Sequence, residues 1–219
     1  MTKNTRKLLW LPGFIRDPLV AIRNRHRYAA QRSLLRQALR KQAATKIIIG
    51  SANTRIEGWV STDYPMLDLI DDRTFAALFD AGEVCKFLAE HVWEHLTQEE
   101  GAKACLNCFV YLKRGGALRI AVPDGFHTNV EYISQVKPGG NGSGCGDHKV
   151  LYNYRTLSAL LEKAGFKVRL LEWFDEQGVF HRENWDAADG FIKRSTRFDP
   201  RNRVHPTAYT SLIIDAFKP

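Results

Sequence analysis

The stretch KIIIGSANTRIEGWVSTD, residues 46–63, carries the most information about the fold. It contains two short apolar runs, the first ending at Gly50-Ser51-Ala52-Asn53 and the second at Asp63. A glycine directly after a buried strand lets a ligand approach the backbone closely. An acid at the tip of the next strand is placed to bind ribose hydroxyls, as in dinucleotide-binding folds. Together they predict a nucleotide-like cofactor at the carboxyl ends of parallel strands.

Short apolar runs alternate with helical segments through the rest of the chain. The expected strands are 46–50, 58–63, 84–91, 116–124, 166–174 and 209–217. One helix begins after the N-cap Thr97 and ends at Gly115-Gly116, and a second covers 156–166 with Gly165 after its last turn. The pattern predicts an α/β fold with a doubly wound, mostly parallel, Rossmann-like sheet of seven strands, covered on both faces. The C-terminal segment is expected to close this sheet as an antiparallel edge hairpin.

A basic arm, residues 1–45, precedes the predicted domain, residues 46–219. Residues 1–46 hold 12 Lys+Arg against the single acid Asp17, a charge of +11, whereas the remainder carries −3 of the total +8. Residues 17–44 are expected to form one or two helices, amphipathic and rich in arginine. The apolar segment Leu8–Ile15 suits either a membrane interface or packing on the protein's own core. The arm alone does not indicate a function.

Composition excludes several classes of protein. With 219 residues, 44% of them hydrophobic, the chain can bury one sizeable core. No apolar stretch approaches the roughly 20 residues that span a bilayer. Four cysteines occur without secretory features, which favours a reducing cytoplasm. We therefore expect a cytoplasmic protein, with the arm as a candidate contact with the inner face of the membrane.

From residue 46 onward the chain resembles the class I S-adenosylmethionine-dependent methyltransferases, within an uncharacterised bacterial branch. The resemblance runs through KIIIGSANTRIEGWVSTD, AEHVWEHL, LKRGGALRIAVPDG and DHKVLYNYRTLSALLEKAGF to the C-terminus. It implies the cofactor S-adenosyl-L-methionine. The loop Gly50, Ser51, Ala52 and Asn53 would then lie beside its methionine part and Asp63 on its ribose. Asp68 and Leu69 would lie near the adenine, and Glu90 and His91 near the transferable methyl group.

One departure from the family pattern concerns Ala52, where many relatives have a second glycine. It brings cofactor affinity, rather than the fold, into question. A side-chain methyl group at this position is compatible with the fold.

Methyl transfer from a sulfonium is an in-line displacement, so the enzyme mainly aligns the acceptor and excludes water. If the acceptor is a hydroxyl, a base must take its proton, and the candidates are His148, His91 and Asp124, in that order, with Asp147 beside them. Each has a structural alternative. His91 would be a satisfied strand-end histidine, Asp124 would form an Asx-turn, and Asp147 and His148 would anchor the glycine-dense loop that precedes them.

Two further motifs are interpreted as structural. His91-Val92-Trp93-Glu94-His95 matches H-x-x-E-H, but it straddles a strand end and has no identifiable third ligand. Some methyltransferases hold a metal with a carboxylate and histidine cluster at this strand end, where Glu94 and His95 are the matching positions, but spacing without a third ligand is poor evidence. No metal is therefore expected, and Glu94 and His95 are expected to cap and orient the following helix. Cys105 and Cys108 form a C-x-x-C inside a helix, and both are interpreted as small buried residues rather than redox groups.

Three functions remain open at this point. The first is methylation of an oxygen of a small molecule or glycan, with a surface-polysaccharide precursor suggested by sugar-modifying relatives. The second is methylation of RNA through the basic arm, which the acidic body disfavours. The third is a non-catalytic binding protein on a methyltransferase fold. His181, Trp185 and Arg197 are further candidates for acceptor contacts, although no spacing argument supports them. The sequence indicates no oligomeric state.

Overall fold

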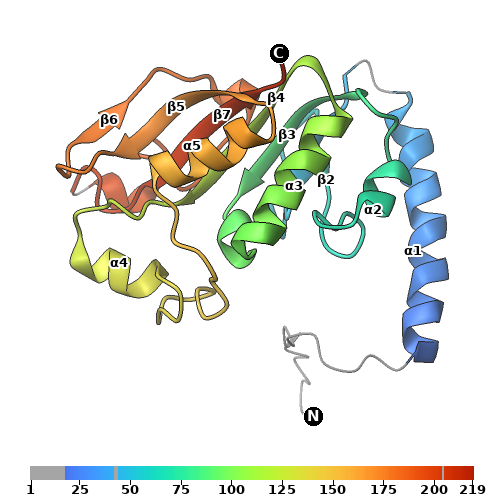
Figure 1. The fold of residues 1–219 in the computed structure, drawn as a ribbon, viewed down its shortest axis with the longest axis horizontal. Coiled ribbons are helices and arrows are strands. Elements are labelled where there is room, and N and C mark those ends of the chain that lie inside the picture. Colours follow the sequence, from blue (N-terminus) through green and yellow to red (C-terminus); the bar gives the residue numbers. More distant parts are fainter. Residues whose placement is uncertain (1–17, 42–43, 204) are drawn as a thin grey trace, which may run out of the picture.

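The fold is known from a computed structural model that describes residues 18–41, 44–203 and 205–219, with backbone only for 18–27. A sheet of seven strands forms its centre (Figure 1). The strands are β1 (Lys46–Ile49), β2 (Val60–Ser61), β3 (Val84–Glu90), β4 (Leu112–Pro123), β5 (Lys167–Phe174), β6 (Phe180–Arg182) and β7 (Ser211–Phe217). The helices are α1 (Pro18–Leu39), α2 (Asp72–Ala76), α3 (Gln98–Tyr111), α4 (Val130–Val136) and α5 (Tyr154–Lys163).

The strand order is β2-β1-β3-β4-β7-β5-β6. Strands β2, β1, β3 and β4 are parallel to one another, and β7 runs antiparallel between β4 and β5. The short strand β6 turns back on β5 as an antiparallel edge hairpin. The predicted seven-stranded Rossmann-like α/β sheet with antiparallel edge strands is confirmed. The last strand, however, lies inside the sheet, where it gains a hydrogen-bonded neighbour on each side.

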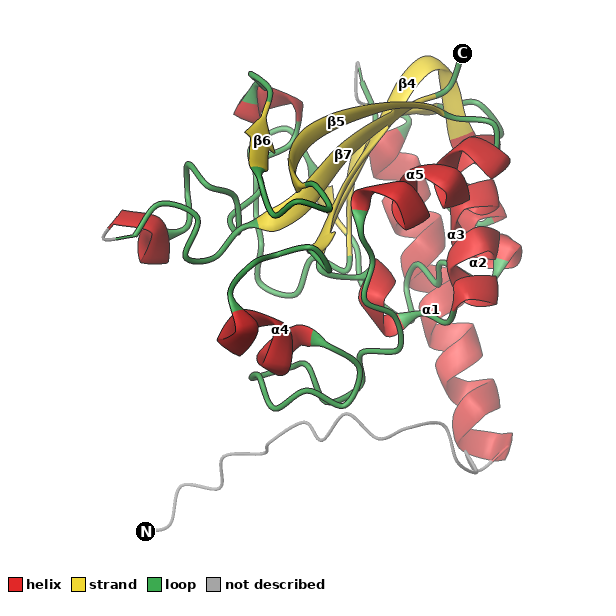
Figure 2. Ribbon diagram, turned by 60° about the vertical axis from the view of Figure 1, so that its left-hand side comes forward, coloured by secondary structure: helices red, strands yellow, loops and turns green. Residues whose placement is uncertain are grey.

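One face of the sheet carries the larger apolar core. Because side chains alternate between the faces of a strand, Ile47, Phe87 and Ile120 all point to this side. There they meet Phe75 of α2, Cys105 and Cys108 of α3, and Leu157 of α5. In Figure 2 these helices lie together on one side of the strands. This face accounts for most of the apolar burial.

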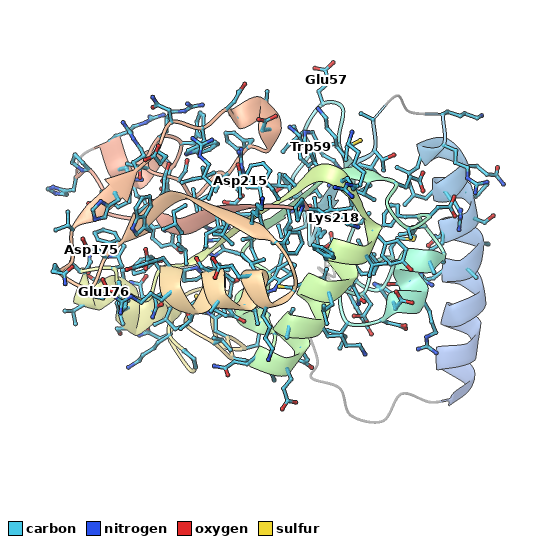
Figure 3. The ribbon with its side chains drawn as sticks, turned by 45° about the horizontal axis from the view of Figure 1, so that its top comes forward. Glu57, Trp59, Asp175, Glu176, Asp215 and Lys218 are labelled. Atoms are coloured by element: carbon cyan, nitrogen blue, oxygen red, sulfur yellow. The ribbon has the colours of Figure 1, made fainter. Side chains whose placement is uncertain are left out.

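The opposite face is covered mainly by the segment 183–199. A smaller cluster joins Ile48, Leu88 and Ile213 of the sheet with Trp59 and Ile192. Beside it the buried guanidinium of Arg119 binds both carboxylate oxygens of Asp215, at 2.7 and 2.8 Å, and donates to the carbonyls of Asp186 and Gly190. Figure 3 labels Trp59 and Asp215 on this side. A buried ion pair thus holds irregular chain on the sheet.

The boundaries of α3 show one error of sequence analysis. Thr97 is the predicted N-cap, and its side chain and that of Glu100 form a capping box. The helix ends at Tyr111, however, and Gly115 and Gly116 lie within β4 rather than at a helix end. Leu112 is already paired with Val84, and a register shift between Val84 and Lys86 accommodates the glycine pair.

The described part of the arm packs on the domain. Leu39 of α1 is 1% exposed and belongs to the larger core. The guanidinium of Arg32 donates to the carbonyl of Met66 at 2.7 Å, and that of Arg36 donates to the carbonyl of Ala76 at 2.7 Å. Arg36 also pairs with Asp80. Several arginines therefore bind the protein itself, whereas the segment Leu8–Ile15 lies outside the described residues.

Within the described chain, no helix combines the length and the apolar character needed to cross a membrane.

Candidate functional site

The ends of the central strands meet at one edge of the sheet. Strands β1, β3 and β4 are parallel, so the residues that follow them gather at their shared carboxyl edge. Strand β7 runs the other way and begins at the same edge, where Ser211 pairs with Pro123. The predicted cofactor loop, His91 and Asp124 are therefore neighbours along one edge, and Ser211 joins them although sequence analysis did not single it out.

The loop after β1 and the end of β2 form one half of the site, which we call the cofactor half (Gly50–Asn53 and Asp63). Gly50 has φ +61°, and a Cβ built there would lie 2.6 Å from Cγ2 of Val92. Glycine is thus required by the backbone and by this close approach. The hydroxyl of Ser51 donates to Oδ2 of Asp63 at 3.0 Å. Oδ1 of Asp63 accepts no hydrogen bond from the described residues, and the side chain is half-buried.

Ala52 and Asn53 are exposed in the turn that follows. Ala52 takes φ +45°, in the left-handed region that glycine adopts without strain. The departure from the family pattern is therefore visible as a locally strained alanine, and the turn keeps the conformation that a glycine would have.

The remaining predicted cofactor residues have structural contacts. Oδ1 of Asp68 accepts the N–H of Ile70 at 3.1 Å in an Asx-turn. Leu69 is 6% exposed and packs in the larger core, which does not suit an open adenine slot. The carboxylate of Glu90 accepts the N–H groups of Lys193, at 3.2 Å, and Arg194, at 2.7 Å. Glu90 thus anchors the segment that covers the second face of the sheet.

His91 is the centre of the other half of the site. Its Nδ1 lies 3.0 Å from Oε1 of Glu94, and its Nε2 lies 2.9 Å from Oγ of Ser211. Its φ of +56° turns the chain sharply at the end of β3. Glu94 is fully buried. Burial acts to raise the pKa of Glu94, but the neighbouring His91 and His95 hold it below its ordinary value.

Glu94 and His95 do not cap α3, contrary to the sequence-based expectation, since Thr97 and Glu100 do so. Instead Glu94, His95 and His148 each offer a ligand atom, and these atoms lie within 4.8 Å of one another. The ring centroids of His95 and His148 are 4.8 Å apart. We call Ser211, His91, Glu94, His95 and His148 the acid–histidine half. His148 is the third potential ligand beside Glu94 and His95, and sequence analysis, which singled it out only as a candidate base, did not connect it with the H-x-x-E-H motif because it lies far away along the chain.

His148 is buried behind the glycine-dense loop. Its Nδ1 donates to the carbonyl of Val136 at 2.6 Å, which leaves Nε2 with the lone pair. The neighbouring Asp147 has its Oδ1 3.0 Å from Nδ1 of His95. The loop itself is folded on α4, since the N–H of Gly142 donates to the carbonyl of Gln135. The loop that leads to Asp147 and His148 is thereby attached to α4.

Asp124 is set apart from these groups by its hydrogen bonds. Its Oδ1 accepts the N–H of Phe126 at 2.9 Å, and its Oδ2 accepts the N–H of Phe174 at 2.8 Å. Burial raises the pKa of Asp124 to about 6, and the two backbone bonds oppose that shift. Asp124 joins β4 to β5 and forms the Asx-turn that sequence analysis offered as its structural alternative.

The other singled-out residues lie elsewhere. Trp185 and Arg197 stack, with 5.3 Å from the guanidinium to the ring, and line a hollow with Glu172 and Arg182. His181 pairs with Asp175 at 2.7 Å and stacks on Trp173; Figure 3 shows Asp175 at the end of the molecule farthest from α1. Cys105 and Cys108 are buried, as expected, and burial raises the pKa of the Cys105 thiol to about 12.

Comparison with known proteins relates the chain to solved structures. No protein-family model and no curated protein sequence matches it. A methyltransferase of Thermotoga maritima, described as S-adenosylmethionine-dependent and as a possible histamine N-methyltransferase, is 13% identical with a TM-score of 0.50, covering 92% of this chain and 97% of that one. An S-adenosylmethionine-dependent methyltransferase of Archaeoglobus fulgidus is 14% identical with a TM-score of 0.46, covering 91% and 98%. The first of these shows that the chain has the fold of the class I S-adenosylmethionine-dependent methyltransferases.

Proposed function

We propose that the chain transfers a methyl group from S-adenosyl-L-methionine to a hydroxyl oxygen of a small molecule or glycan precursor. The observation that carries this proposal is the cofactor half. Asp63 follows β2 and accepts the Ser51 hydroxyl on one oxygen, while its other oxygen accepts no hydrogen bond from the described residues. A carboxylate so held is suited to accept the two hydroxyls of a ribose.

The cofactor, when bound, would supply a methyl group on a positively charged sulfur. In our proposal Asp63 fixes the ribose, and the loop 50–53 contacts the methionine part. The residues at the ends of β3 and β4 then face the acceptor, because they lie next along the same edge.

His91 is the base that we assign to the acceptor proton. Its Nδ1 lies against the carboxylate of Glu94, which favours the tautomer with the proton on Nδ1. Nε2 is then the basic atom, and an acceptor hydroxyl would replace Ser211 as its partner. Asp124 is a poorer base because both of its oxygens already hold backbone N–H groups.

Methylation of RNA receives less support. Arg32 and Arg36 of the basic arm donate to backbone carbonyls of the domain, and Arg40 lies 3.2 Å from Asp80. Arginines engaged in this way neutralise fewer phosphates.

Calorimetry with S-adenosylmethionine and S-adenosylhomocysteine tests the proposal. We expect micromolar binding, weakened about 10- to 100-fold by Asp63→Ala, because hydrogen bonds to a charged group contribute about 1.5–3 kcal/mol. Glu57→Ala is the matched control, since it removes the same charge from an exposed position in the connection that precedes β2. Absence of binding to folded wild-type protein would overturn the proposal and favour a non-catalytic role.

A further inference from the structure

We propose that Glu94, His95 and His148 bind a divalent transition-metal ion. One carboxylate and two imidazoles present their ligand atoms within 4.8 Å of one another. Two histidines with one carboxylate form the ligand set of many catalytic zinc and non-haem iron sites. The sequence-based expectation of no metal rested on the lack of a third ligand, and His148 supplies it.

The first supporting observation is a buried carboxylate with unused hydrogen-bonding capacity. Glu94 is 0% exposed, and although His91 lies against Oε1, Oε2 accepts no hydrogen bond from the described residues. Nearby, the buried hydroxyl of Tyr152 likewise has no partner among them. Leaving such groups unsatisfied is costly. A cation beside Oε2 would compensate the carboxylate and bring coordinated water within reach of other polar groups.

The second observation is the way the two imidazoles are held. Nδ1 of His148 donates to the carbonyl of Val136 at 2.6 Å, and Nδ1 of His95 lies 3.0 Å from Oδ1 of Asp147. Metal-ligating histidines characteristically place their other ring nitrogen against a carbonyl or carboxylate, which fixes the ring and its tautomer. Here the carbonyl of Val136 is the partner of His148, and the carboxylate of Asp147 is the partner of His95. Nε2 of each ring is therefore the ligand atom that we assign.

The separation of the groups suits a site that tightens around its ion. Ligands about 2.0–2.1 Å from a tetrahedral zinc ion are about 3.4 Å from one another. The widest pair here would have to close by about 1.4 Å, a movement that rotation of the imidazole rings can supply. Magnesium and calcium prefer oxygen ligands, so the two nitrogens favour Zn²⁺, Mn²⁺ or Fe²⁺.

The position of the site suggests its use, and this step rests on the proposed function. Glu94 and His95 follow β3, and His148 follows the loop after β4, so the ion would lie beside the acceptor rather than beside Asp63. A divalent ion that coordinates an acceptor hydroxyl lowers its pKa and holds its oxygen in place. The proton would then pass to Nε2 of His91. The oxygen would form its bond to the methyl carbon as the bond between that carbon and the cofactor sulfur breaks, and S-adenosylhomocysteine would leave.

The test is a titration of the tag-free full chain, treated with a chelator, with Zn²⁺ and separately with Mg²⁺ in the absence of S-adenosylmethionine. We expect one equivalent of Zn²⁺ to bind with micromolar or tighter affinity, and Mg²⁺ to bind at least about 100-fold more weakly. Glu94→Gln and His148→Gln should each weaken Zn²⁺ binding about 100-fold, and Asp147→Asn about 10-fold. His181→Gln is the control, because that histidine also faces a carboxylate but lies outside the group.

Titration with Co²⁺ adds a spectroscopic measure, since visible absorption bands report nitrogen and oxygen coordination. Zn²⁺ binding that is absent, or that persists unchanged in Glu94→Gln and His148→Gln, would overturn the inference. If Glu94→Gln fails to fold, Asp147→Asn decides, because that side chain is partly exposed. Because the cofactor is omitted, a lack of Zn²⁺ binding would not contradict the Asp63-dependent binding of S-adenosylmethionine. Conversely, Zn²⁺ binding without binding of S-adenosylmethionine would support the metal site and contradict the proposed function.

Discussion

The two halves of the candidate site are built in opposite ways. In the cofactor half the residues lie within one strand-turn-strand unit, are at least partly exposed apart from Ser51, and share a single side-chain hydrogen bond, from Ser51 to Asp63. In the acid–histidine half they come from β3, the loop after β4 and the start of β7, and they contact one another in a largely buried network. The first half is suited to receive a ligand, and the second to hold chemical groups in fixed positions.

The difference shows how polar groups are stabilised at each place. Water can solvate Asp63, so the cofactor half tolerates an incomplete set of partners. Glu94 is removed from water and depends on His91 and on any cation that binds beside it. Substitution of His91 or Glu94 should therefore reduce stability, whereas substitution of Asp63 should mainly reduce binding.

The largest effect is expected from His91→Ala. It leaves the buried carboxylate of Glu94 without the imidazole that lies against it, and a buried charged group that loses its hydrogen-bonding partner costs about 3 kcal/mol or more. Urea unfolding of the variant should show this loss. His181→Ala breaks the corresponding pair with Asp175 at the surface and should change the unfolding free energy far less. Equal losses in the two variants would mean that burial does not distinguish these pairs.

The second prediction concerns how the stability contributed by Asp124 depends on pH. Burial raises the pKa of Asp124 to about 6 from its ordinary 3.8, so the folded chain binds this proton more tightly than the unfolded chain does. The resulting stabilisation is complete below about pH 4 and is lost as pH rises through about 6. Its size is about 2–3 kcal/mol, because one pKa unit corresponds to about 1.4 kcal/mol.

Carboxyl NMR of Asp124 measures this pKa directly, and unfolding of Asp124→Asn at several pH values measures the energy. The difference in stability between wild type and variant should fall between pH 4 and pH 7. A carboxyl midpoint below 4 would show that the N–H groups of Phe126 and Phe174 outweigh burial.

The contrast between the two halves also explains which residues of the site could be predicted from the sequence and which could not. Gly50 and Asp63 were identified because a strand, a turn and a second strand determine their placement locally. Thr97 was identified as an N-cap because its partner Glu100 is three residues away. Ser211 and His148 join His91 and Glu94 only through the antiparallel insertion of β7 and the packing of a long loop on α4. No local pattern encodes those contacts.

Gly50→Ala should have a smaller effect on stability than the loss of His91. A residue with a side chain at φ +61° costs about 1–2 kcal/mol, and the new Cβ would lie 2.6 Å from Cγ2 of Val92. We expect a destabilisation of about 2 kcal/mol. In a Val92→Ala background the contact is relieved and only the backbone cost remains, about 1 kcal/mol. If the unfolding free energies of Gly50→Ala and Val92→Ala were simply additive in the double mutant, that result would contradict a close approach between residues 50 and 92.

Ala52→Gly should have the smallest effect. Its φ of +45° suits glycine, so the substitution removes about 1 kcal/mol of strain. Glycine also raises the conformational entropy of the unfolded chain, which offsets this gain by a comparable free energy. We expect a net change within about 0.5 kcal/mol in thermal unfolding, and Ala52→Val should be clearly destabilising because a branched side chain tolerates this conformation poorly. Since Ala52 is exposed, the affinity for S-adenosylmethionine should be unchanged in Ala52→Gly. A gain of tenfold or more would instead place the alanine methyl against the cofactor, and the cofactor half would then be more tightly packed than its few internal contacts suggest.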